Sequence, residues 1–231
     1  MSGNSTHTPL LHEVAEHCLT ILHDHGVPLP QDVAIDWQTF AQLSKQVHDN
    51  FQIPSTTFTP MMRRLVFAIA ETAQPRNIVG AGTFVGYTFA WLIRERAEAS
   101  HPPDCAIGID VDSEANIIAR TNCRILNHDN HLNFLDGDAV TWLKQLDIPI
   151  DLLYVDVDSP EQGRKMLYVD VLEASLPRLR SGALVLAHDA SLPLFANSFA
   201  QYNAFVRNHP KLVGPWTLPV DECGLSVTAV L

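Results

Sequence analysis

The sequence has few cationic residues. Only 15 of its 231 residues are lysine or arginine, against 26 aspartate and glutamate residues, so the formal net charge is −11. A protein that binds nucleic acid needs clustered lysine and arginine to contact the phosphates. We therefore expect no nucleic-acid partner, and we do not expect RNA or DNA as a substrate.

Cysteine is also scarce. Cys18, Cys105, Cys123 and Cys223 are far apart and form neither a Cys-x-x-Cys pair nor a zinc-binding spacing. Such isolated cysteines are typical of reduced thiols in a cytoplasmic protein. The sequence also lacks an apolar run long enough to cross a bilayer, and its first residues contain no apolar signal core. We therefore expect a cytoplasmic location and no membrane partner.

Length and hydrophobic content predict one globular domain preceded by a helical piece. The chain has 231 residues and 46% hydrophobic content, enough to bury a sizeable core. Residues 9–25 and 36–51 carry apolar side chains at helical spacing. We assign them to an N-terminal helical extension, residues 1–58, and the remaining residues 59–231 to the main domain. The extension would be either a lid or a dimerisation element, and in the second case the protein would be a homodimer.

The stretch from residue 77 to residue 92 is the centre of the main domain. Asn77–Val79 is a short apolar run that predicts a buried strand, and Gly80, Gly82 and Gly86 follow it before a helical pattern begins. Glycine allows the backbone to turn sharply and to approach a ligand closely. The next helix would present unpaired N–H groups to that ligand. This order of strand, glycine turn and helix predicts a nucleotide-binding loop.

A second predicted strand supports a nucleotide site. Ala106–Ile109 is apolar and is followed by Asp110, the place where a βαβ fold hydrogen-bonds ribose hydroxyls. Asp110 lies 28 residues after Gly82, whereas a dinucleotide fingerprint expects about 20. The spacing therefore argues against NAD.

Together these motifs resemble the class I S-adenosylmethionine-dependent methyltransferases, and among them the small-molecule O-methyltransferases of the catechol and caffeoyl-CoA type. The resemblance covers roughly residues 59–231. The matching segments are the glycine loop at 82–87, the ribose-binding strand end at 109–112, the adenine-facing segment at 136–139, and the fourth and fifth strands at 153–158 and 182–189. The resemblance implies a Rossmann-like α/β fold, with a mostly parallel seven-stranded sheet that ends in an antiparallel hairpin.

The resemblance also implies S-adenosylmethionine as the cofactor and a set of residues that bind it. An acidic side chain in the third segment would accept a hydrogen bond from the adenine amino group, and we assign this role to Asp138. The same residue could instead form a turn and cap a helix. The implied cofactor-binding residues are Gly80, Ala81, Gly82, Thr83, Gly86, Tyr87, Asp110, Val111, Asp138, Ala139 and Asp156.

The sequence departs from the family pattern at the positions of its metal and its base. Gly80 stands where the family usually has glutamate, and Ser159 stands where it often has a catalytic lysine. His188-Asp189 replaces the Asp-Asn pair of the metal-dependent members. About six extra residues, around positions 160–165, separate the fourth strand from the helix that follows it. These changes leave most of the cofactor site intact.

The candidate catalytic residues are Asp156, His188 and Lys165. Open α/β sheets bind ligands at the carboxyl ends of their strands, where Asp156, His188 and Asp189 fall. These three could hold Mg²⁺ or another divalent cation, which would orient the acceptor hydroxyl and lower its pKa. Alternatively, His188 acts alone as general base, or His188 and Asp189 form only a satisfied loop pair. Lys165 could replace the missing lysine, but the sequence does not fix its direction.

We therefore expect methyl transfer from S-adenosylmethionine to a small-molecule acceptor, at a hydroxyl oxygen. Three alternatives stay open: methylation of carbon or nitrogen without a metal, a non-catalytic protein that keeps the cofactor fold, and an NAD-dependent oxidoreductase. The sequence does not identify the acceptor, because the loops and helices that would surround it have no fixed side-chain directions at this stage.

Overall fold

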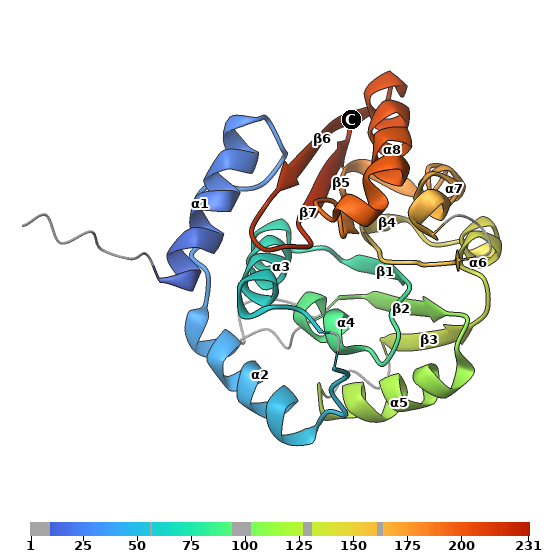
Figure 1. Cartoon of the computed structure of the whole chain (residues 1–231). Helices are drawn as coiled ribbons and strands as arrows, with labels where there is room; N and C mark the ends of the chain where they lie inside the picture. The colour runs from blue at the N-terminus through green and yellow to red at the C-terminus, as the bar shows by residue number, and fades with distance from the viewer. Residues whose placement is uncertain (1–9, 56, 94–102, 127–130, 161–163) are drawn as a thin grey trace, which may run out of the picture.

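The computed structural model describes residues 10–55, 57–93, 103–126, 131–160 and 164–231. Figure 1 shows a central sheet with helices on both of its faces. The seven strands are arranged in the order β3-β2-β1-β4-β5-β7-β6. The predicted sheet is therefore present.

Five strands are parallel and the last two form a hairpin. The parallel strands are β1 (Asn77–Ala81), β2 (Cys105–Asp110), β3 (Leu132–Asp136), β4 (Ile150–Val155) and β5 (Leu179–His188). β7 (Leu225–Val230) pairs antiparallel with β5, and β6 (Leu212–Leu218) pairs antiparallel with β7. The predicted fold class, including its terminal antiparallel hairpin, is confirmed.

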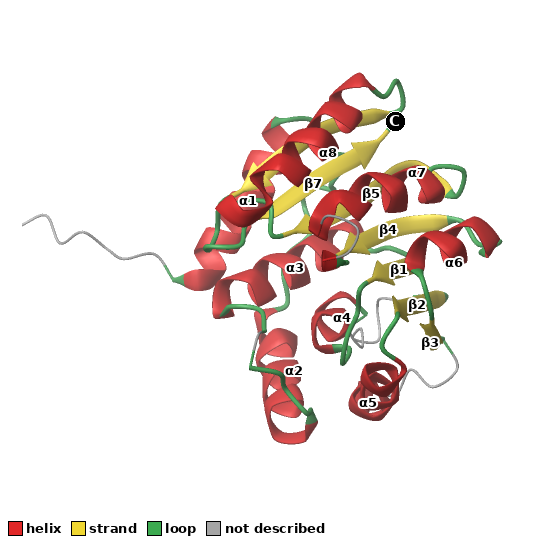
Figure 2. Ribbon diagram, turned by 45° about the vertical axis from the view of Figure 1, so that its right-hand side comes forward, coloured by secondary structure: helices red, strands yellow, loops and turns green. Residues whose placement is uncertain are grey.

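Two hydrophobic cores lie on opposite faces of the sheet, because successive side chains of a strand point to opposite sides. In β1, Ile78 joins one core and Val79 the other, and in β4 Tyr154 and Val155 divide in the same way. The first core contains side chains of α1 (Leu11–Asp24), α2 (Trp37–Asn50), α3 (Pro60–Ala73), α4 (Tyr87–Leu92), α5 (Ser113–Cys123) and η1 (Arg124–Leu126). The second contains side chains of α6 (Ala139–Gln145), α7 (Leu167–Ser175), η4 (Pro193–Phe195) and α8 (Ala196–Asn208), and Figure 2 shows these three α-helices on the same face.

Side-chain caps fix where several helices begin. Asp36 and Asp112 each accept hydrogen bonds from two backbone N–H groups of the helix that follows, and Thr59 accepts one with proline at the first helical position. Asp112 lies two residues after the end of β2. The start of α5 is therefore held at the edge of the sheet where the parallel strands end.

The N-terminal helices share the first core with the main domain. α1 packs against α3, and the Phe40 ring of α2 meets Phe67 of α3 and Trp91 of α4 at centroid distances of 5.2 and 5.5 Å. The predicted boundary between residues 58 and 59 falls just before α3, and this division into two units stays a prediction. No helix among the described residues has both the length and the apolar content needed to cross a bilayer.

Candidate active site

The glycine turn after β1 is fixed by the end of β4. The backbone N–H of Asp156 donates to the Ala81 carbonyl at 2.8 Å, and the N–H of Gly82 donates to the Ile109 carbonyl at 2.8 Å. Gly82 has a φ of +80°, and a Cβ there would lie 2.4 Å from the Asp156 carbonyl oxygen. Only glycine fits this close approach of two backbones.

We expect Gly82→Ala to destabilise the protein more than Gly26→Ala. Gly26 has nearly the same φ, +79°, but a Cβ there would meet nothing within 4 Å. Both variants carry the left-handed backbone strain of about 1–2 kcal/mol. Only Gly82→Ala adds a clash with backbone, which costs a further 1–3 kcal/mol or so. Urea denaturation measures the difference, and equal losses would show that the ends of β1 and β4 separate without cost.

A cavity of about 520 Å³ lies beside this turn. Six of the predicted cofactor-binding residues line it, namely Gly82, Asp110, Val111, Asp138, Ala139 and Asp156. Leu167 and Val171 of α7 also line it, and the sequence analysis missed them. Their spacing of four residues on a helix was the available signal.

The other predicted cofactor-binding residues do not line this cavity. They are Gly80, Ala81, Thr83, Gly86 and Tyr87. Gly80 lies within β1, where a Cβ would be 2.6 Å from the methyl group of Thr83 and 2.9 Å from the Phe89 ring. Tyr87 is buried and its hydroxyl accepts a hydrogen bond from Arg63. Glycine at position 80 is therefore explained by packing, and the cofactor roles of these five residues stay predictions.

Asp110 joins the end of β2 to the glycine loop. Its Oδ2 accepts from the backbone N–H of Phe84 at 2.7 Å, and its Oδ1 accepts from that of Asp112 at 3.0 Å. The buried Asn116 side chain donates to the Asp110 carbonyl at 3.1 Å and to Asp136 Oδ1 at 2.8 Å. Asn116 was not among the predicted residues, and it holds the ends of β2 and β3 in place.

Asp138 caps α6 at the wall of the cavity. Its Oδ1 accepts from the backbone N–H and from the hydroxyl of Thr141, both at 2.7 Å. This is the alternative role that the sequence left open. The cap does not exclude contact with a ligand, because Asp138 and Ala139 also line the cavity. The adenine role of Asp138 stays a prediction.

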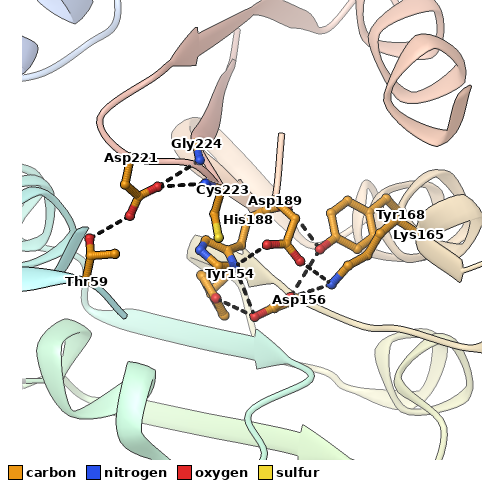
Figure 3. A network of polar contacts seen from close by, with 10 residues as sticks. All are labelled: Thr59, Tyr154, Asp156, Lys165, Tyr168, His188, Asp189, Asp221, Cys223 and Gly224. Carbon is orange, nitrogen blue, oxygen red and sulfur yellow. Dashed lines mark hydrogen bonds and ion pairs between the residues drawn. The ribbon is translucent and has the colours of Figure 1, made fainter. Parts of the chain in front are cut away.

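A partly buried cluster of charges lies at the ends of β4 and β5, and we call its members Asp156, Lys165, His188 and Asp189 the charge cluster (Figure 3). Lys165 Nζ lies 2.6 Å from Asp156 Oδ1 and 3.0 Å from Asp189 Oδ2. His188 Nδ1 lies 3.4 Å from Asp156 Oδ2 and 3.2 Å from Asp189 Oδ1. The structure thus brings together all the predicted catalytic and metal-ligating residues. It also gives Lys165, which belongs to η3 (Arg164–Met166), the direction that the sequence could not.

Two tyrosine hydroxyls complete the surroundings of Asp156. Tyr154 donates to its Oδ2 at 3.0 Å, and Tyr168 donates to its Oδ1 at 3.4 Å and lies 3.2 Å from the His188 carbonyl. Burial and the charge of Asp156 raise the pKa of both tyrosines well above the usual value. Both are therefore neutral hydrogen-bond donors. Neither tyrosine was predicted from the sequence to contact Asp156.

The members of the charge cluster differ in the direction in which their surroundings shift their pKa values. Burial alone would raise the pKa of Asp156, but the contacts with His188 and Lys165 outweigh it and lower that pKa to about 2. Burial alone would lower the pKa of His188, but the contacts with Asp156 and Cys223 and the charge of Asp189 raise it to about 10. The same two carboxylates raise the pKa of Lys165 despite its burial. At neutral pH Asp156 is therefore the unprotonated member of the predicted catalytic trio, which disfavours His188 as the general base.

A hydrogen-bonded loop joins the cluster to the start of α3. Asp221 accepts from the Thr59 hydroxyl at 2.6 Å and from the backbone N–H groups of Cys223 and Gly224 at 3.0 and 2.9 Å (Figure 3). The Ser191 N–H donates to the Cys223 carbonyl at 2.7 Å. The side-chain atoms of His188, Asp189 and Cys223 that could bind a metal ion consequently lie within 4.8 Å of one another.

The predicted metal ligands do not fit a hard divalent cation as they are arranged. Mg²⁺ prefers oxygen ligands in near-octahedral geometry. Here the oxygens of Asp156 and Asp189 face Lys165 and His188, and an imidazole takes the place of one oxygen donor. The carboxylates are thus already occupied by cationic side chains of the protein.

Comparison with known proteins identifies the fold. The profile of a family described as a methyltransferase domain matches residues 79–190. The catechol O-methyltransferase of Niastella koreensis is 23% identical over 139 residues, and the match spans 58% of this chain and 58% of that relative.

Two solved structures show how far the similarity extends. The O-methyltransferase of Bacillus cereus in complex with S-adenosylhomocysteine aligns with a TM-score of 0.63 at 17% identity, over 95% of this chain and 99% of its own. TomG of Streptomyces achromogenes, in complex with S-adenosylmethionine, aligns with a TM-score of 0.64 at 16% identity, over 92% of this chain and 96% of its own. These findings confirm the Rossmann-like methyltransferase fold and the family resemblance predicted from the sequence.

Proposed function

We propose that this chain, which carries a methyltransferase domain of the class I type, transfers the methyl group of S-adenosylmethionine to a hydroxyl oxygen of a small molecule. The observation that carries this proposal is the position of Asp156. It lines the cavity beside the glycine turn and also belongs to the charge cluster. A carboxylate at this boundary can act on an acceptor held beside the cofactor.

The cavity suits the cofactor in size and in polar groups. Its volume of about 520 Å³ falls within the usual range for small-molecule sites. Asp110 can accept hydrogen bonds from ribose hydroxyls through the lone pairs that its backbone contacts leave free. The described contacts of Asp138 use Oδ1, so Oδ2 is available to the adenine amino group. Gly82, which has no Cβ, lets the turn lie directly against the Asp156 backbone at the wall of this cavity.

The sulfonium of S-adenosylmethionine supplies an activated methyl group, so the chain has to orient the acceptor and exclude water. As the acceptor oxygen bonds to the methyl carbon, the carbon–sulfur bond breaks, the sulfur keeps the electron pair, and the hydroxyl proton must leave. Asp156 carries no proton at neutral pH, and it can accept this one because the acceptor oxygen becomes strongly acidic as it bonds to the methyl carbon. The nearby Lys165 and His188 hold that carboxylate in its charged form.

The choice of oxygen rests on the relatives. The Niastella protein and both structures described above are named O-methyltransferases. An acceptor carbon or nitrogen is the second candidate, because the same carboxylate could accept a proton from either. The acidic composition supports a small molecule over nucleic acid. The predicted homodimer stays a prediction.

Calorimetric titration with S-adenosylhomocysteine tests the cofactor site. We expect Asp110→Ala to weaken binding by about 10–100-fold, because hydrogen bonds to a charged group contribute about 1.5–3 kcal/mol. Asp112→Ala is the matched control. The Asp112 side chain caps α5 by accepting hydrogen bonds from the backbone N–H groups of Glu114 and Ala115. Its removal should leave the affinity for S-adenosylhomocysteine unchanged.

The same titration separates the proposed function from its alternatives. Binding of NAD in place of S-adenosylhomocysteine would contradict the proposal and favour the oxidoreductase. Tight binding without methyl transfer to any phenolic, hydroxylated or amino acceptor would favour the non-catalytic protein. Tritiated S-adenosylmethionine follows transfer to each acceptor directly.

A further inference from the structure

We propose that Lys165 supplies the cation of this active site, so that the site binds no divalent metal. The inference deepens the proposed function and rests on it only where methyl transfer is concerned. Its structural part, the occupation of Asp156 and Asp189 by an ammonium group, rests on the contacts of the charge cluster alone.

Every carboxylate oxygen in the cluster already faces a polar side chain of the protein. In Asp156, Oδ1 faces Lys165 and Oδ2 faces Tyr154 and His188. In Asp189, Oδ2 faces Lys165 and Oδ1 faces His188. The two carboxylates thus face one ammonium group and one imidazole ring. A metal ion could use these oxygens only after these contacts were broken.

The position of Lys165 also opposes a metal ion. Its side chain is only 4% exposed, and its ammonium lies over the rings of Tyr168 and Phe195 at 5.3 and 5.4 Å. A divalent ion between Asp156 and Asp189 would place two more positive charges next to this group, in surroundings that screen charge poorly. The lysine cannot turn into water without leaving this packing.

The place of the lysine in this chain differs from the family pattern. Ser159, at the position where the family often has lysine, lines the cavity, whereas Lys165 does not. Lys165 instead contacts the carboxylates of Asp156 and Asp189. The cationic group of this chain thus contacts Asp156 and Asp189 and does not line the cavity. Lys165 is therefore a positioning residue, which acts through Asp156, a residue that lines the cavity.

Metal titration of the full chain tests the inference without relying on activity. Mn²⁺ is titrated into the wild type, Lys165→Met and Lys144→Met, and its binding is followed by the loss of the free-ion electron paramagnetic resonance signal. Methionine keeps the length of lysine without its charge. Lys144 is an exposed lysine of α6, so its variant controls for a change in net charge. Circular dichroism checks that each variant is folded.

We expect no stoichiometric Mn²⁺ site in the wild type or in Lys144→Met, and one site in Lys165→Met. Wild-type activity should be the same in EDTA as in Mg²⁺. One Mn²⁺ bound per wild-type chain would overturn the inference, as would a folded Lys165→Met that binds none. If Lys165→Met does not fold, the wild-type titration decides alone.

Zn²⁺ provides a second arm, because His188, Asp189 and Cys223 offer softer donors. We expect no stoichiometric Zn²⁺ site in the wild type. Zinc binding that is lost in Cys223→Ser would overturn the inference. Titration with S-adenosylhomocysteine in the same samples keeps the two proposals apart, since its failure would refute the proposed function and leave the metal result valid.

Discussion

Asp156→Asn is expected to lower kcat by a factor of about 10²–10⁴, the usual contribution of a positioned group that accepts a proton. The amide keeps the size of the side chain but cannot take a proton from the acceptor hydroxyl. Binding of S-adenosylhomocysteine should change less, because the polar side chains assigned to ribose and adenine, Asp110 and Asp138, remain. Single-turnover transfer measures the chemical step separately from binding.

The same substitution removes one of the two carboxylates that balance Lys165 and His188. Breaking a buried charge pair typically costs about 3–5 kcal/mol, so urea denaturation must accompany the kinetics. Asp158→Asn is the control, since Asp158 lines the same cavity but pairs with the partly exposed Arg164 at 3.1 Å. That pair is worth about 1 kcal/mol at most. A comparable loss of kcat in both variants would contradict the special role of Asp156.

The fold could be predicted because its signals are local. The apolar runs at 77–79 and 106–109 fall within β1 and β2, and the residues after them supply the turn and the acidic strand end. The last strand, β7 (Leu225–Val230), alternates apolar and polar residues from Leu225 to Thr228. Such sequence patterns predict strands because successive side chains of a strand point to opposite faces of the sheet, and here each face carries a hydrophobic core.

The site was predictable only where the chain itself determines position. Asp110 and Asp156 follow parallel strands, so they had to reach the same edge of the sheet. Lys165 follows a segment without periodicity, and nothing local decides where its side chain points. Asn116 left a signal that was not used, since it shares a helix face with Ala119 and Cys123, both buried. A polar residue on an apolar face predicts a buried hydrogen bond.

The protonation states and roles of the site residues were less predictable than their positions. The ordinary pKa of histidine suits a general base at neutral pH, and this favoured His188 in the sequence. That expectation assumes a neutral ring, whereas here Nδ1 faces two carboxylates from different segments. Asp138 shows the same limit, because a helix cap and a ligand contact require the same residue type. Only neighbours that are distant in sequence distinguish these roles.

The stability of the cluster depends on Lys165 more than on any other cation in it. We expect Lys165→Met to lower the free energy of unfolding by about 3–5 kcal/mol, because Asp156 and Asp189 would stay buried with only His188 to balance them. In Lys165→Met/Asp189→Asn, one carboxylate then faces one imidazolium. The double variant should therefore be more stable than the sum of the two single losses predicts, by about 0.5–3 kcal/mol.

Urea denaturation of the four proteins in this cycle gives the coupling energy between Lys165 and Asp189. The distance of 3.0 Å between Nζ and Oδ2 places them in direct contact, so their effects cannot be independent. Strictly additive losses would mean that Asp156 alone holds the ammonium and that Asp189 is free to bind another cation. The cycle therefore tests, through stability, the same exclusion of metal that the Mn²⁺ titration tests through binding.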